Sequence, residues 1–328
     1  MSCLTRLPEP VSLCACILAF SSVVSSVWGE TQTGTPRRVL VGDYSTHLIG
    51  IANADGTLAW QFPIDAIHDL QMLSNGNILF QTSWTDLVEM TPDKKVVWSY
   101  NAREANGNGQ RDHVEVHAFQ RLSNGLTMVA ESGPRRIIEV DTQGAIQHQI
   151  QLDVKTSNQH CEMRMARKIE ATGHYLVCHE ADGAVREYDS KGNVVWEFDV
   201  PLFGKEPKGG HGVEAFGNMV YGAIRLSNGN TLIATGNGHS VLEVNPEKKI
   251  VWRIEQNDLP GIQLAWVTSL AELPNGNFVI GNCHAGPENP QIIEVTRDKK
   301  VVWTFKDFKH FGNSLAVSQV LDVKGVIR

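Results

Sequence analysis

Apolar and polar positions along the chain form short runs that recur at a regular interval. An apolar run, a turn and a second apolar run make up "HDLQMLSNGNILFQTS" from His68, and nearly the same pattern returns from residues 117, 221 and 268. A second phrase follows each one, as in "LVEMTPDKKVVWSY", and its last strand usually ends in Val-Val-Trp. Each pair of phrases predicts two β-hairpins, which are four short strands bounded by turn residues.

The four-strand unit repeats about every 40 to 55 residues, which is typical of a β-propeller blade. Complete units begin near His68, His117, Arg164, Tyr221 and Thr268. Residues 37–62 supply three further strands, and "SLAVSQVLDVKGVIR" at the C-terminus supplies one. We therefore predict an all-β fold, a six-bladed β-propeller of four-stranded blades in which N- and C-terminal strands pair in one blade. Such closure removes the two exposed sheet edges of an open array.

The first thirty residues differ from the rest of the chain. Arg6 precedes an uncharged run over residues 11–28, which Gly29 and Glu30 follow. That layout is typical of a secretory signal peptide, and the many serines argue against a membrane anchor. We expect a signal peptide at 1–29, a short linker at 30–36 and the propeller at 37–328, in a protein that is exported to the periplasm or secreted and keeps no membrane span.

Composition limits the partners and the source of stability. The chain is 42% apolar and 20% charged, with a formal net charge of −7, which gives no general electrostatic attraction to nucleic acid or anionic lipid, and we expect neither partner. Three of the six cysteines leave with the signal peptide, and Cys161, Cys178 and Cys283 remain. An odd number excludes a full disulfide framework and leaves at least one thiol unpaired or intermolecular, so stability must come mainly from packing. We expect a monomer.

Histidines gather on the face that is predicted to carry the long connections. Aligning the repeats places ten of the twelve there, and only His148 and His174 fall elsewhere. The same alignment puts His68, His117, Arg164, Tyr221, Thr268 and Ala316 at one level of the six inner strands, above mostly apolar residues. We therefore predict a polar channel mouth, because long loops on a rigid scaffold usually carry function.

Three kinds of chemistry could use this mouth. Imidazole acts as a base or nucleophile near neutral pH, and a guanidinium holds anions, so the catalytic candidates are His68, His117 and Arg164. The candidates for ligand binding are His113, Glu115, His160, Arg167, His179, Glu180, His211, Tyr221, His239 and His284. A divalent metal with Glu115 or Glu180 as a carboxylate ligand is the third option. It would have to be assembled across blades, because His113 and His117 on one strand lie about 13 Å apart.

Two resemblances bear on these options. "HD…LSNGNIL" and "VHAFQRLSNG" resemble blade starts of bacterial arylsulfotransferase-like propellers, six-bladed exported proteins in which a channel histidine accepts a sulfuryl group. That resemblance implies His68 and His117 as the matching histidines, with Arg164 or Arg167 as the anion clamp. "IANADGTLAWQF" and "YDSKGNVVWEF" resemble repeats of exported quinoprotein-like (PQQ-like) propellers, which include dehydrogenases and proteins without a cofactor.

The leading interpretation is a non-catalytic binding or scaffold protein. Quinoprotein dehydrogenases usually have eight blades and a calcium ion with carboxylate ligands, so six blades and a histidine-rich mouth disfavour PQQ. We expect a small polar or anionic ligand, or a protein partner, on the long-loop face. An arylsulfotransferase-like transferase and a histidine-ligated metal site remain the alternatives.

Overall fold

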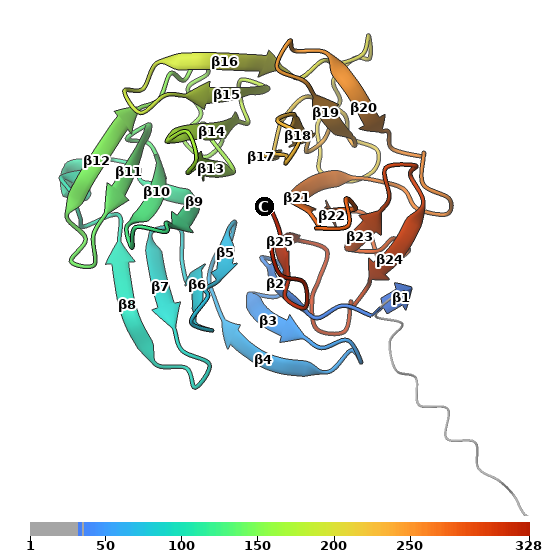
Figure 1. Cartoon of the computed structure of the whole chain (residues 1–328), viewed down its shortest axis with the longest axis horizontal. Helices are drawn as coiled ribbons and strands as arrows, with labels where there is room; N and C mark the ends of the chain where they lie inside the picture. The colour runs from blue at the N-terminus through green and yellow to red at the C-terminus, as the bar shows by residue number, and fades with distance from the viewer. Residues whose placement is uncertain (1–31, 35) are drawn as a thin grey trace, which may run out of the picture.

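Six antiparallel sheets, five of four strands and one of five, form a closed ring (Figure 1). A computed structural model describes residues 32–34 and 36–328, so the predicted signal peptide lies outside the described residues. The predicted six-bladed propeller is confirmed. Within the described part, no helix is long and apolar enough to cross a membrane. A short 3-10 helix, η1, spans Asn108–Gln110.

Four blades are continuous in sequence, and each runs from its innermost strand outwards. They are β5 (Leu70–Met72), β6 (Ile78–Gln81), β7 (Asp86–Met90) and β8 (Val96–Asn101); β9 (Glu115–Arg121), β10 (Thr127–Ser132), β11 (Arg136–Val140) and β12 (Ile146–Gln151); β13 (Ala166–Ile169), β14 (His174–His179), β15 (Ala184–Tyr188) and β16 (Val194–Asp199); and β17 (Gly222–Arg225), β18 (Thr231–Ala234), β19 (Val241–Val244) and β20 (Ile250–Ile254).

The two remaining blades join the ends of the chain. They contain β21 (Trp266–Glu272), β22 (Phe278–Cys283), β23 (Ile292–Val295) and β24 (Val301–Phe305), with β1 (Gln32–Gly34) on the outer edge; and β25 (Leu315–Val320), β2 (Val39–Asp43), β3 (Leu48–Ala52) and β4 (Leu58–Pro63). Antiparallel pairing of β25 with β2 closes the ring as predicted. Residues 32–34, within the segment expected as a linker, form β1, which pairs with β24.

The inner hairpins are as short as the repeated Ser-Asn-Gly sequence requires. In the first, Leu73 N–H donates to Asn77 O at 2.8 Å and Gly76 N–H donates to Leu73 O at 2.9 Å. Gly76 has φ of 86°, a left-handed conformation that favours glycine. The same bonds recur around Gly125, Gly229 and Gly276. These minimal turns lie on one face of the ring, and the long connections are left on the opposite face.

Tryptophans at the repeated Val-Val-Trp position join neighbouring blades, as the sequence predicts. Trp60 and Trp303 are buried. The indole N–H of Trp196 donates to Pro246 O at 3.2 Å, and that of Trp252 donates to Arg297 O at 2.7 Å, in each case across to the next blade. Because each ring spans a blade boundary, these residues stabilise the stacking of blades.

Candidate functional site

Three inner strands carry an extra residue at the level predicted for the channel mouth. Val116 and Ala118 of β9 pair with consecutive residues of β10, so His117 is left out of the ladder. Ala316 is left out of β25 in the same way, and Tyr221 is an extra residue at the start of β17. A β-bulge re-aims the extra side chain. These bulges therefore turn one residue of each strand toward the axis.

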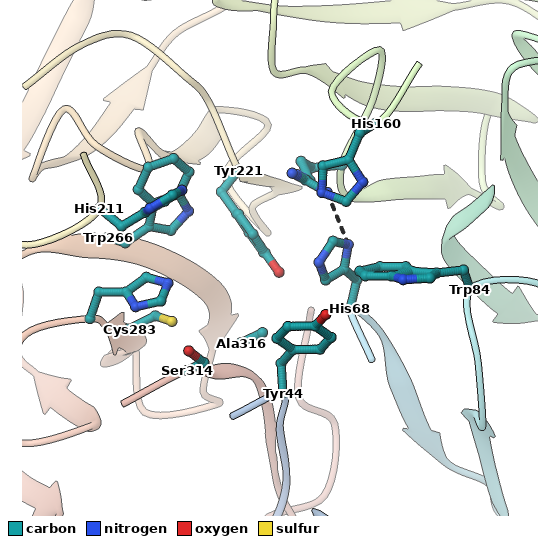
Figure 2. A pocket seen from close by; sticks show the side chains of 12 residues that line it. Tyr44, His68, Trp84, His160, His211, Tyr221, Trp266, Cys283, Ser314 and Ala316 are labelled. Carbon is teal, nitrogen blue, oxygen red and sulfur yellow. Dashed lines mark hydrogen bonds between the residues drawn. The ribbon is translucent and has the colours of Figure 1, made fainter. Parts of the chain in front are cut away.

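A cavity of about 430 Å³ opens at the long-loop end of the channel (Figure 2). Its walls come from five blades and from the loops between them. The lining residues are Tyr44, His68, Trp84, His160, Arg164, His211, Tyr221, Trp266, Cys283, His284, Ser314 and Ala316. The alignment of inner strands correctly placed His68, Arg164, Tyr221 and Ala316 on one opening.

Beside the cavity, three imidazoles surround the carboxylate of Glu115. His117 Nε2 lies 2.9 Å and His160 Nδ1 2.8 Å from Glu115 Oε2. His113 Nε2 lies 3.3 Å from the other oxygen, Oε1. Burial opposes the charge of Glu115, but the hydrogen bonds from His117 and His160 hold its pKa well below the usual range. Glu115 is therefore an anion that shares protons with its histidine neighbours.

His68 continues this network into the cavity. Its Nδ1 lies 2.8 Å from Nδ1 of His117, a separation at which one proton must lie between the two nitrogens. Because His117 donates from Nε2 to Glu115, the shared proton belongs to His68. Burial lowers the pKa of His117 to about 3 and that of His68 well below its ordinary value. Both rings are therefore neutral, and Nε2 of His68 carries a lone pair.

Arg164 places a guanidinium at the inner end of the cavity. Its Nη1 lies 3.2 Å from His68 Nδ1 and 3.1 Å from His117 Nδ1, and its Nε contacts the buried carboxylate of Glu180. Burial opposes the charge, but Glu180 raises the pKa of Arg164, which therefore stays protonated. Nη2 donates to the thiol of Cys161 at 3.8 Å, a long contact that leaves this nitrogen with donor capacity.

The opposite wall holds two more of the predicted histidines. The His211 ring lies 4.7 Å from the Trp266 ring and 5.2 Å from the His284 ring, measured between centroids. Burial, followed by the proximity of His211, lowers the pKa of His284 to about 4. Cys283 lines the same wall. Cys161, Cys178 and Cys283 are all buried free thiols.

Six residues predicted to bind ligand do not line the cavity. His113 and Glu115 lie beside it, and Glu180 contacts Arg164. The other three are Arg167, His179 and His239. Arg167 Nη1 and Nη2 donate to Asp69 at 2.7 and 2.9 Å in a buried ion pair, so this guanidinium already has its anion. His179 contacts the carbonyl of Glu162 and the hydroxyl of Tyr188 through its two ring nitrogens.

His239 is held in the same structural manner. Both of its ring nitrogens contact backbone carbonyls, those of Ala265 and Ala215. The alignment predicts the correct face for these histidines, but it does not predict that their rings turn inward to satisfy loop carbonyls.

Sequence reasoning missed the aromatic walls of the cavity. Trp84 lies in the loop between β6 and β7, outside the repeated tryptophan position, and its ring is 4.8 Å from that of His68. Tyr44 follows β2 and lies near Trp84, at 5.7 Å between centroids. Trp266 begins β21, ahead of Thr268 at the expected level. The available signal was the break in the Val-Val-Trp pattern, because these residues do not serve the blade boundary.

Comparison with known proteins identifies the family. Residues 44–305 match the sequence model of the family described as outer membrane protein assembly factor BamB. The chain belongs to this family. The BamB family match agrees with the PQQ-like repeats, and no curated protein matches the chain.

Solved structures agree on the fold. A protein of unknown function from Bacteroides caccae is 25% identical with a TM-score of 0.72, over 88% of this chain and 99% of its own. A streptogramin B lyase is 12% identical with a TM-score of 0.56, over 84% of this chain and 85% of its own. Virginiamycin B lyase from Staphylococcus aureus, as a catalytically inactive variant with quinupristin, is 11% identical with a TM-score of 0.54, over 85% of this chain and 89% of its own. The two lyases are similar in fold alone.

Proposed function

We propose that this BamB-family propeller is an exported protein that binds a small anionic ligand with an aromatic or apolar body. The supporting observation is the cavity of about 430 Å³, in which one guanidinium faces several aromatic rings. Ligand sites in proteins typically measure about 300 to 1,000 Å³ and combine apolar walls with a few convergent polar groups. A molecule with one or two rings and an acidic group matches that volume and that lining.

Two polar groups are available to a ligand. Nη2 of Arg164 donates to the Cys161 thiol at the long distance of 3.8 Å, and a guanidinium binds sulfate, phosphate or carboxylate with paired hydrogen bonds. The hydroxyl of Tyr221 is buried without a hydrogen-bond partner among residues 36–328, and it points toward the middle of the cavity (Figure 2). Buried polar atoms are almost always paired, so an orphaned hydroxyl at this place supports a ligand that accepts from it.

The aromatic rings provide the apolar part of the site. Tyr44 and Trp84 lie on one side of the opening, and Trp266 lies on the other (Figure 2). Stacking between aromatic rings contributes about 0.5 to 1.5 kcal/mol beyond the burial of area. Removing one ring should therefore weaken binding by roughly 3- to 10-fold.

Calorimetric titration of the purified protein with 4-nitrophenyl sulfate and 4-nitrophenyl phosphate tests this proposal. Inorganic sulfate should bind more weakly than either ester, and uncharged benzyl alcohol should not bind. Trp84→Ala should weaken binding, whereas Phe203→Ala removes an exposed aromatic ring outside this cavity and should leave binding unchanged. No binding of either ester, or equal losses in both variants, would refute the proposal.

A second candidate function is sulfuryl transfer, which the lone pair of His68 Nε2 favours. This nitrogen has no hydrogen-bond partner within residues 36–328. It would attack the sulfur of an aryl sulfate as the ester S–O bond breaks, and the aryl oxide would leave. The sulfuryl group would then pass to a hydroxyl acceptor. Release of 4-nitrophenolate that depends on added phenol, and that His68→Ala abolishes, is the expected result; its absence in the wild type excludes this function.

Export is supported by the charge and apolar pattern of residues 1–29. Expression of the full chain followed by cell fractionation and N-terminal sequencing tests it. The expected product lies outside the cytoplasm and begins near Glu30, and an intact chain in the cytoplasm would contradict export.

A further inference from the structure

The arrangement around Glu115 differs from the other histidine–carboxylate contacts of the described chain. His174 contacts Glu187 at 2.7 Å and His310 contacts Asp307 at 2.8 Å, with one imidazole for each carboxylate. Glu115 has three imidazoles within 3.3 Å, those of His113, His117 and His160. They come from strand β9, the residues before it and the loop before β13. The fold therefore brings separate segments to one point.

One nitrogen of these imidazoles has no hydrogen-bond partner within residues 36–328. The Nε2 atom of His113 is buried, and its approach to Glu115 lacks the alignment of a hydrogen bond. A buried ring nitrogen in this state requires an explanation. Nε2 of His113 faces the same carboxylate that His117 and His160 contact. A metal ion, which accepts lone pairs from several ligands, would give the three imidazoles and the carboxylate a common partner.

We propose that Glu115, His117 and His160 bind a divalent transition-metal ion of the Zn²⁺ class, with His113 available as a fourth ligand. One donor atom from each of the first three residues lies within 4.8 Å of the others. Tetrahedral zinc with bonds near 2.0 Å places its donor atoms about 3.3 Å apart. The present separations of 2.8 and 2.9 Å from Glu115 Oε2 need only a small adjustment to admit the ion.

The donor set selects the class of metal. Imidazole nitrogens with one carboxylate suit Zn²⁺, Ni²⁺, Cu²⁺ and Fe²⁺, whereas Mg²⁺ and Ca²⁺ prefer oxygen ligands throughout. Entry is open, because the His160 side chain is 45% exposed and lines the cavity. A further coordination position would face the cavity on that side.

The neighbours of His117 complete the site. A ligating histidine almost always donates from its other nitrogen, and that partner fixes the orientation of the ring. Nδ1 of His117 faces Nδ1 of His68 at 2.8 Å. With the metal on Nε2, His117 would donate to His68, and His68 would carry its proton on Nε2. Metal binding would therefore present an N–H donor to the cavity in place of a lone pair.

Metal binding can be measured directly on the purified chain after treatment with a chelator. Titration with Co²⁺, followed by its visible absorption, and calorimetry with Zn²⁺ should each give one ion per chain. Glu115→Gln and His160→Ala should each weaken Zn²⁺ binding at least 100-fold. The matched controls His174→Asn and His310→Asn should retain it, because they remove isolated histidine–carboxylate contacts.

Two outcomes would overturn the proposal: less than one ion per chain in the wild type, or unchanged affinity in His160→Ala. Because His160 is exposed, His160→Ala is the variant that should fold normally, and its thermal unfolding should match that of the wild type. The proposal goes beyond ligand binding and fails separately from it, because the aryl ester titrations can be performed on chelator-treated protein.

Discussion

The buried contact between Asp69 and Arg167 joins three inner strands below the cavity. Asp69 Oδ1 accepts from Leu70 N–H at 2.9 Å and from Arg167 Nη2 at 2.9 Å. Its Oδ2 accepts from Phe119 N–H at 3.0 Å and from Arg167 Nη1 at 2.7 Å. One carboxylate therefore links β5, β9 and β13. Replacing Asp69 tests how much these hydrogen bonds between inner strands contribute to the stability of the propeller.

Asp69→Asn should destabilise the protein by about 3 to 5 kcal/mol, the usual cost of breaking a buried ion pair by removing one partner. The new amide nitrogen is a donor, so two of the four hydrogen bonds are lost whichever way the amide turns. Arg167 would also remain charged near Arg328, whose guanidinium donates to Leu70 O. Burial, followed by the charge of Arg167, already lowers the pKa of Arg328 to about 10.

Urea unfolding followed by tryptophan fluorescence measures this change in the free energy of unfolding. Asp93→Asn is the matched control, because Asp93 is exposed and contacts Lys95 and Thr91 in the same exposed turn. That surface pair should contribute less than about 1 kcal/mol. A loss below about 1 kcal/mol for Asp69→Asn would show that the carboxylate does not fasten the inner strands.

Three further predictions concern the backbone, the core and the pH dependence of stability. Gly229 has φ of +87°, and a methyl group placed on its Cα would have nothing within 4 Å. Gly229→Ala should therefore lower the free energy of unfolding by about 1 kcal/mol through backbone strain alone. Gly209→Ala, in open space without this φ, should leave the free energy of unfolding in urea almost unchanged. Phe119→Ala should lower the free energy of unfolding by about 3 to 5 kcal/mol, because the ring is fully buried. Val251→Ala, at a 52% exposed position, should change it by less than about 0.5 kcal/mol. Burial, followed by Arg186, lowers the pKa of His179 to about 4. As pH falls from about 6.5 to 4, His179 is protonated in the unfolded chain but not in the folded chain, so up to about 3 kcal/mol of stability is lost in that window. Urea midpoints that do not fall between pH 7 and pH 5 would contradict this.

The fold could be predicted because each propeller blade repeats the same sequence pattern. The turn around Gly76 and the tryptophans at the blade boundaries are required by the local structure of a blade, so the same residue types recur in each repeat. Ring closure followed from counting strands at both chain ends. Strand β1 could not be predicted in the same way, because three residues carry no periodicity, and only the free edge of β24 makes them a strand.

The site was partly predictable for the same reason. The strand alignment places His68 and Arg164 at the channel mouth, because they occupy equivalent positions in different blades. It does not predict the bulge that re-aims His117, because a bulge is a property of the paired strands. For His239 the alignment predicts the correct face but not the orientation of the ring. Its nitrogens contact backbone carbonyls of loops that are not part of the repeat.

If ring closure gathers Arg164, Trp84 and Trp266 around one ligand cavity, a crystal structure of the protein with 4-nitrophenyl sulfate will show it. We expect the sulfate group within hydrogen-bond distance of the Arg164 guanidinium, and the aromatic ring between Trp84 and Trp266. A ligand bound elsewhere, or an empty cavity in crystals soaked at a concentration that saturates the protein in solution, would contradict it.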